Sequence, residues 1–160
     1  MRATVSRWEA GICRSRVLQE PDGARLEAAL AELDGEVCTE LSVERWEEGG
    51  GALTVSGGPG VFLVTGECDD GTLIQLCRAR AAGHGTGDGP GRRVRPKELG
   101  ARCLDGELSG PSEEPMWLVC GGQGAYFPAG ELVDGAAARW AVREFLAGFP
   151  GGIGAPWRVE

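Results

Sequence analysis

The stretch from residue 116 to residue 157 constrains the fold most, because it joins an apolar run, a glycine turn and an amphipathic segment. Its first five residues, from Met116 to Cys120, carry no charge, and two glycines follow directly. This pattern is typical of a strand that is buried on both faces and ends in a turn. We therefore expect this strand to form the centre of a sheet.

The segment from Leu132 to Leu146 is predicted to be a helix that lies on this sheet. Gly148 and Pro150 follow it and are typical helix stops. Its apolar residues recur at spacings of three and four, as one buried helix face requires; they are Val133, Ala136, Ala137, Trp140, Ala141 and Phe145.

Four motifs follow one another between residues 116 and 157. They are Trp-Leu-Val-Cys-Gly-Gly-Gln, an aromatic residue before proline, an alanine-rich helix containing Ala-Val-Arg-Glu-Phe-Leu-Ala-Gly, and a tryptophan near the end. In this order they resemble the C-terminal half of a family of bacterial immunity proteins, which are encoded beside polymorphic toxins. The residues that match the family pattern are Gly121, Gly122, Gln123, Pro128, Phe145 and Trp157.

The resemblance implies a small α+β protein that neutralises a toxin by binding it and that catalyses nothing. The usual toxin of this family is a deaminase. For the six matching residues the resemblance implies structural roles, such as a glycine turn that allows close packing.

The remaining chain predicts an N-terminal helix and then an antiparallel meander. Leu26, Ala29, Leu30 and Leu33 form one apolar helix face, with Asp22 where a helix begins and Gly35 where one ends. Strands are expected at residues 37–46, 53–55, 61–64 and 72–78, and shorter ones at 4–8 and 101–104. The predicted fold is therefore a single α+β domain over residues 1–160, a mostly antiparallel sheet packed by an N-terminal and a C-terminal helix.

Residues 81–98 differ in composition from the rest, because glycine dominates and no apolar residue recurs periodically. Such a segment buries too little apolar surface to offset its ordering entropy, so we expect a flexible loop. Its basic residues are expected to be solvated, with nucleic-acid contact as the alternative; they are Arg92, Arg93, Arg95 and Lys97.

The formal net charge of −8 argues against nucleic acid or an anionic membrane as a partner, since both would be repelled. A basic partner protein is the natural complement. No window approaches the length of an apolar membrane span, and the N-terminus lacks the apolar core of a signal peptide. We therefore expect a cytoplasmic protein.

The sequence predicts no catalytic residue, no metal and no cofactor. The six cysteines form no C-x-x-C pair, and His84 is the sole histidine, so we expect reduced thiols and no zinc site. Neither G-x-G-x-x-G nor G-x-x-x-x-G-K-[ST] occurs. The H-x-E and P-C-x-x-C motifs of zinc deaminases are also absent, which separates this chain from the toxin itself.

Acidic residues concentrate between Glu36 and Asp70, where eight acids face one base, Arg45. In the strand predicted at 37–46, Leu41 and Val43 occupy one face while the acids and Trp46 occupy the other. Trp46 either anchors an interface or caps the edge of the core. The residues predicted to bind the partner are Glu44, Trp46, Glu47, Glu48, Asp69 and Asp70.

Three functional hypotheses follow. The first is an immunity protein that binds a basic cognate toxin, expected to be a deaminase, as a 1:1 heterodimer and blocks access to its active site. The second is a chaperone-like or regulatory binding module for a secreted effector, which would grip an extended segment instead. The third is an enzyme whose site the sequence does not reveal.

Overall fold

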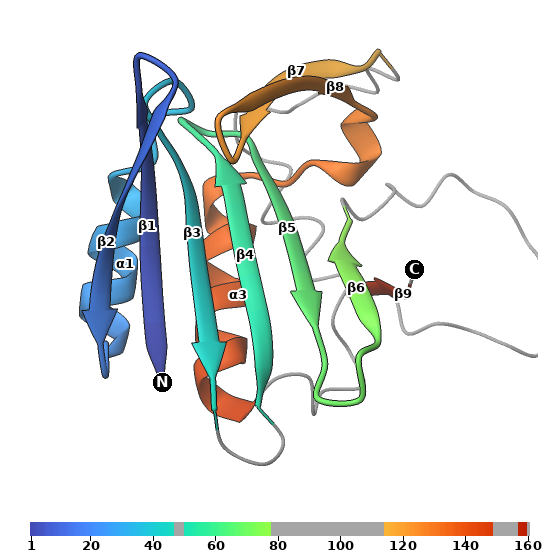
Figure 1. The fold of residues 1–160 in the computed structure, drawn as a ribbon. Coiled ribbons are helices and arrows are strands. Elements are labelled where there is room, and N and C mark those ends of the chain that lie inside the picture. Colours follow the sequence, from blue (N-terminus) through green and yellow to red (C-terminus); the bar gives the residue numbers. More distant parts are fainter. Residues whose placement is uncertain (47–49, 78–113, 149–156, 160) are drawn as a thin grey trace, which may run out of the picture.

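A seven-stranded antiparallel sheet dominates the computed structural model, which describes residues 1–46, 50–77, 114–148 and 157–159 (Figure 1). The strand order is β2-β1-β3-β4-β5-β6-β9. Its strands are β1 (Arg2–Glu9), β2 (Ile12–Gln19), β3 (Cys38–Arg45), β4 (Gly51–Gly57), β5 (Phe62–Glu67), β6 (Leu73–Leu76) and β9 (Trp157–Val159). A separate two-stranded sheet consists of β7 (Met116–Cys120) and β8 (Gln123–Phe127).

Two helices, α1 (Gly23–Ala31) and α3 (Gly135–Gly148), pack on the same face of the large sheet (Figure 1). A short 3-10 helix, η1 (Ala129–Glu131), connects β8 to α3. An ion pair joins the two helices, since Arg143 Nε donates to Glu27 Oε1 at 2.8 Å. The helices thus form one layer and the sheet the other, which is a common solution for burying one face of each.

Polar side chains fix where the helices begin. Asp22 caps α1, because its Oδ1 accepts the Arg25 backbone N–H at 2.8 Å. Asp134 plays the same role for α3, with the Ala137 N–H at 2.9 Å. Each carboxylate satisfies a backbone donor that has no partner inside the helix. The sequence therefore determines the starts of both helices locally.

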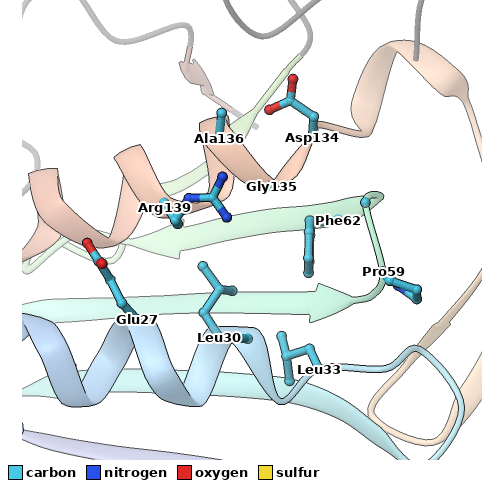
Figure 2. Close-up of a pocket in the computed structure, with 11 residues that line it drawn as sticks. Glu27, Leu30, Leu33, Pro59, Phe62, Asp134, Gly135, Ala136 and Arg139 are labelled. Carbon is cyan, nitrogen blue, oxygen red and sulfur yellow. The ribbon is translucent and has the colours of Figure 1, made fainter. Parts of the chain in front are cut away.

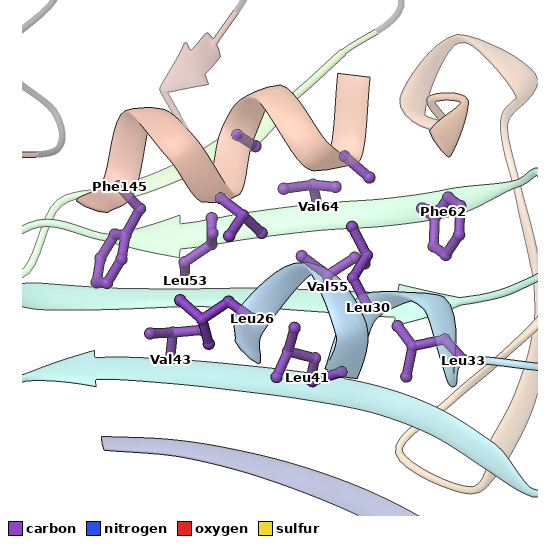
Figure 3. Packing of buried hydrophobic residues seen from close by; sticks show 14 of the residues in the cluster. Leu26, Leu30, Leu33, Leu41, Val43, Leu53, Val55, Phe62, Val64 and Phe145 are labelled. Carbon is purple, nitrogen blue, oxygen red and sulfur yellow. The ribbon is translucent and has the colours of Figure 1, made fainter. Parts of the chain in front are cut away.

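The hydrophobic core lies between the helices and one face of the sheet (Figure 3). From β3 and β4, Leu41, Val43, Leu53 and Val55 are fully buried, and Phe145 of α3 is also at 0% exposure. These residues lie at alternate positions along their strands, and the cross-strand register places them side by side. Every second strand residue consequently points to the other, helix-free face.

The sequence-based fold class is confirmed: the protein is α+β, and a mostly antiparallel sheet is packed by an N-terminal and a C-terminal helix. The meander is also confirmed, since β3, β4, β5 and β6 pair with their sequence neighbours. None of the helices in the described part of the chain is long and apolar enough to cross a membrane.

The prediction that Met116–Cys120 forms the sheet centre is wrong. The residues do form a strand, β7, but it pairs only with β8, and Trp117 is 58% exposed. One face of this hairpin packs on the large sheet, while the other presents aromatic rings to solvent. An uncharged run does not distinguish such an aromatic outer face from a second buried face, which explains the error.

Three strands were not predicted: β2, β8 and β9. Strand β2 lies at the sheet edge and carries alternating polar residues, so it lacks the apolar signal of a core strand. The Ala10-Gly11 turn before it has positive φ angles of 51° and 78°, as a two-residue hairpin turn requires. The loop predicted at 81–98 and the strand predicted at 101–104 lie outside the described residues.

Candidate functional site

The helix-free face of the large sheet, which we call the open face, is built from polar and small side chains. The register aligns three cross-strand rows on it. The row across the middle consists of Thr4, Ser42, Thr54, Thr65 and Gln75. Such residues fit a sheet surface that faces water or a partner and not a second apolar layer.

The row at one end of the open face is acidic. Glu44 of β3 and Glu67 of β5 flank Ala52 of β4, so the two carboxylates lie two strands apart on the same face. Asp69 and Asp70 follow β5 in the adjacent turn and are exposed. We call Glu44, Trp46, Glu67, Asp69 and Asp70 the acidic end. The structure thus brings together residues from two segments that the sequence-based site had combined.

Four of the six predicted partner-binding residues lie at the acidic end: Glu44, Trp46, Asp69 and Asp70. The other two, Glu47 and Glu48, lie outside the described residues. Thr72 holds Asp70, since its backbone N–H donates to Asp70 Oδ1 at 2.9 Å. Hydrogen bonds from the Thr72 side chain and backbone lower the pKa of Asp70, so this carboxylate is charged at neutral pH.

Trp46 is 63% exposed and lies outside the buried cluster, so it does not cap the core. The Arg2 guanidinium carbon lies 4.7 Å from the centre of its ring, in a cation–π contact. Arg2 also donates to Glu44 Oε2 at 2.7 Å. One arginine therefore holds both Glu44 and Trp46 on the open face, and part of the negative charge there is balanced.

A groove of about 420 Å³ runs along the open face over β4, β5 and β6. Phe127 of β8 and Glu131 of η1 form one side. The floor and remaining walls include Thr54, Leu63, Thr65, Glu67, Leu73 and Gln75. The groove therefore combines apolar walls, neutral hydroxyls and two carboxylates, and it reaches the acidic end through Glu67.

A polar network anchors one side of this groove. Arg158 of β9 donates to Gln75 Oε1 at 2.7 Å and to Glu131 Oε1 at 3.2 Å. Gln75 Nε2 in turn donates to the Glu131 backbone oxygen at 3.4 Å. Gln75 is 6% exposed, so these hydrogen bonds satisfy a buried amide. Glu131 is thus ion-paired within the chain, whereas Glu67 has no ion pair with any described residue.

The hairpin β7-β8 covers the opposite end of the open face. Its two-residue turn, Gly121-Gly122, has φ angles of 54° and 75° and lies against β1 and β3. The Gly122 N–H donates to Thr39 Oγ1 at 3.3 Å. A Cβ on Gly122 would lie 2.2 Å from the Trp8 ring, so the indole packs directly on this glycine. The sequence-based structural role of the turn is thereby explained.

The outer face of the hairpin carries an exposed aromatic pair, Trp117 and Tyr126. The two residues are cross-strand partners, and their rings meet edge to face with centroids 5.1 Å apart. They are 58% and 70% exposed. The Trp117 ring lies over Gly124, where a Cβ would be 2.0 Å from the ring. Exposed aromatic rings of this kind are typical anchors in protein interfaces.

A second groove, of about 650 Å³, lies on the other side of the molecule between α1, α3 and the β4-β5 turn (Figure 2). Leu30, Leu33 and Phe62 form its apolar floor. Among its acids, Glu27 is paired with Arg143 and Asp134 caps α3. These carboxylates therefore already have structural partners.

The thiols near the open face are not arranged as nucleophiles. Burial raises the pKa of Cys120 above its ordinary value, and the Glu40 carboxylate adds to this effect, although a hydrogen bond with Ser56 opposes it. Burial likewise raises the pKa of Cys38. Both thiols are protonated at neutral pH, and a thiol reacts as its thiolate. His84, the sole histidine, lies outside the described residues.

The described residues contain no group of three or more histidines, cysteines or acids placed to hold a metal ion. The sequence reasoning missed Glu67 as a site residue, and it also missed the aromatic pair. The alternation of Leu63, Thr65 and Glu67 could have placed Glu67 on the same face as Glu44. Comparison of the chain with family models, curated proteins and solved structures yields no match.

Proposed function

We propose that this protein is an immunity protein, which binds a basic cognate toxin and blocks access to its active site. The observation that carries the proposal is the open face. Among the described elements both long helices pack on one side of the sheet, and the other side presents acids and aromatic rings. A sheet face without a covering layer is a natural contact surface for another protein.

The charge of the open face supports a basic partner. Glu67, Asp69 and Asp70 lie together at the acidic end, and the whole chain carries a net charge of −8. A toxin that acts on nucleic acid needs a basic cleft to bind its substrate. Complementary charge would steer the two proteins together and raise the association rate. The family resemblance favours a deaminase as this toxin.

The exposed large apolar side chains supply the second half of the argument, because charge alone gives a fast but weak complex. Trp46, Trp117 and Tyr126 are each more than half exposed. Aromatic side chains that become fully desolvated carry much of the free energy of binding in protein interfaces. We therefore expect the acidic end to set the association rate and the aromatic rings to slow dissociation.

A binding role without catalysis also agrees with the chemistry of the described side chains. The carboxylates with structural partners are satisfied by caps or arginines, and the pKa values of Cys38 and Cys120 are raised. General acid–base or nucleophilic catalysis needs an activated group beside its base. The proposal places the protein in the cytoplasm, where it would meet the toxin as a 1:1 complex.

The test is co-expression with the product of the neighbouring toxin gene in a sensitive host. The proposal expects survival only when this protein is present, together with a 1:1 complex in size-exclusion chromatography. A catalytically inactive toxin serves as the control for expression burden. Killing that is equally efficient with and without this protein would refute the proposal.

A chaperone-like module is the second candidate, and edge strand β2 is the observation that favours it. This strand has eight residues, seven of them exposed, and its outer edge pairs with no described strand. An extended segment of a secreted effector could add to such an edge. Hydrogen exchange of the complex separates the two candidates. Protection of the open face supports the immunity function, whereas protection of β2 together with an active toxin supports the chaperone.

A further inference from the structure

We infer that the open-face groove receives an arginine side chain of the basic partner, with Glu67 as its principal acceptor. This inference rests on the proposed function, since it assumes a basic protein on the open face. It goes further by naming one contact and its chemistry. The groove is distinct from the exposed aromatic pair and from the groove between the helices.

The first support is the order of chemistry along the groove. Leu63 and Phe127 line its apolar end, Thr54 and Thr65 follow, and Glu67 lies at the acidic end. Leu63 and Glu67 are four residues apart on β5, a span of about 13 Å. Long basic side chains bury an aliphatic stem against apolar surface and keep the charged head among polar groups. The groove presents these two environments in that sequence.

The second support is the state of its two carboxylates. Glu131 is paired with Arg158, and the same arginine binds Gln75, so that side of the groove is electrostatically satisfied. Glu67 is exposed and forms no ion pair with any described residue. An incoming cation therefore finds its unbalanced charge at Glu67 and a repelling charge near Glu131. This arrangement fixes the direction in which the side chain enters.

The third support is the number of acceptors around Glu67. The carboxylate accepts two parallel hydrogen bonds, and the hydroxyls of Thr54 and Thr65 supply further acceptors on the same face. A guanidinium has five donors in a planar fork, whereas an ammonium is a compact point charge. The groove consequently fits arginine better than lysine.

A methyl NMR titration of the whole protein tests this inference without the toxin. The probe is the blocked tripeptide acetyl-Gly-Arg-Gly-amide, and its citrulline and lysine counterparts serve as comparisons. We expect the arginine peptide to shift the methyl signals of Leu63 and Leu73. The citrulline peptide, which has a similar shape but no charge, should shift them far less, with lysine between the two.

Two matched variants make the test specific. Glu67→Gln should weaken arginine-peptide binding about two- to five-fold, as expected for an exposed charge pair. Asp69→Asn removes the same charge from the same end of the sheet but outside the groove, and it should have little effect. Signals of core methyl groups report that both variants remain folded.

The inference is overturned if the groove methyl signals do not move up to the solubility limit of the arginine peptide. Equal weakening by Asp69→Asn and Glu67→Gln would also overturn it, because the attraction would then be general and not specific to the groove. Its failure is distinguishable from failure of the proposed function. A protein that protects cells against the toxin but ignores the peptide keeps the function and loses this contact.

Discussion

The two faces of the large sheet use the same strands for different purposes. On β4, Leu53 and Val55 are fully buried beneath the helices, while Thr54 between them lies on the open face. The helix-covered face is an apolar layer in which shape and volume determine stability. The open face carries the acids, the groove and the covering hairpin, where charge and exposed rings determine what can bind. Stability and recognition are therefore separated by the alternation of a strand.

The largest expected effect comes from comparing two neighbouring residues of β4. Leu53→Ala should lower the free energy of unfolding by about 2–5 kcal/mol, because it leaves a cavity beside Phe145 (Figure 3). Thr54→Ala should cost about 1 kcal/mol or less. Urea unfolding followed by circular dichroism measures both values. Equal costs would mean that the open face is also part of the stabilising core.

The hairpin that covers the open face gives the next prediction. Gly122→Ala should destabilise the protein by about 2–3 kcal/mol, because it combines a positive φ angle with a clash against Trp8. Gly11→Ala is the matched control, since Gly11 also has a positive φ angle but no atom within 4 Å of the added Cβ. It should cost about 1 kcal/mol. Similar losses in both variants would exclude the ring contact as the cause.

The aromatic pair gives a prediction that separates binding from stability. Trp117→Ala should weaken the toxin complex by about 2 kcal/mol, as expected for an interface anchor. Its free energy of unfolding should fall by about 1 kcal/mol or less, since only the cross-strand ring contact is lost. Trp117→Phe keeps a ring and is the control for both quantities. Isothermal titration calorimetry showing unchanged affinity for Trp117→Ala would exclude the hairpin from the interface.

The smallest expected effect concerns Asp34, at the edge of the helix-covered layer. Its Oδ1 accepts the backbone N–H groups of Glu36, Val37 and Cys38 at 2.8–2.9 Å. Burial opposes ionisation of this carboxyl, but these donors and the charge of Arg7 lower its pKa below the ordinary 3.8. Asp34→Asn should therefore cost about 1 kcal/mol at neutral pH.

The pH dependence of this cost follows from the lowered pKa. The wild-type advantage is fully present above the ordinary carboxyl pKa and is lost as the pH falls through the lower pKa of the folded protein. Urea unfolding of both proteins at a series of acidic pH values measures it. A difference that stays constant as the pH falls would show that charge is not the cause.

The sequence predicted the helix-covered layer well, because burial leaves a periodic trace. The apolar faces of residues 26–33 and 133–145 and the strands of the meander all appear in the alternation of apolar residues. The open face left a weaker trace. Its acids could be recognised as a cluster in the chain, but the alignment of Glu67 with Glu44 depends on register across three strands, which a single sequence does not contain.

The hairpin shows where reasoning from periodicity fails. An uncharged run predicted a doubly buried strand for Met116–Cys120, yet Trp117 projects into solvent and pairs with Tyr126. The two-residue glycine turn followed by Tyr126 and Phe127 was the available signal for a hairpin. What no local pattern could provide was the partner surface, since Trp8 lies more than a hundred residues before the glycine on which it packs.

The central claim, that the acidic end meets a basic partner, is tested most directly by the association rate with the cognate toxin. Stopped-flow measurements at low and physiological salt would compare Glu67→Lys/Asp69→Lys with Glu9→Lys/Glu36→Lys. Both double variants change the net charge equally, but the second alters exposed acids in loops at the opposite end of the sheet. We predict that the first lowers the rate about ten-fold at low salt and much less at physiological salt, while the second has little effect. Equal slowing by both variants, or no slowing by the first, would contradict the account.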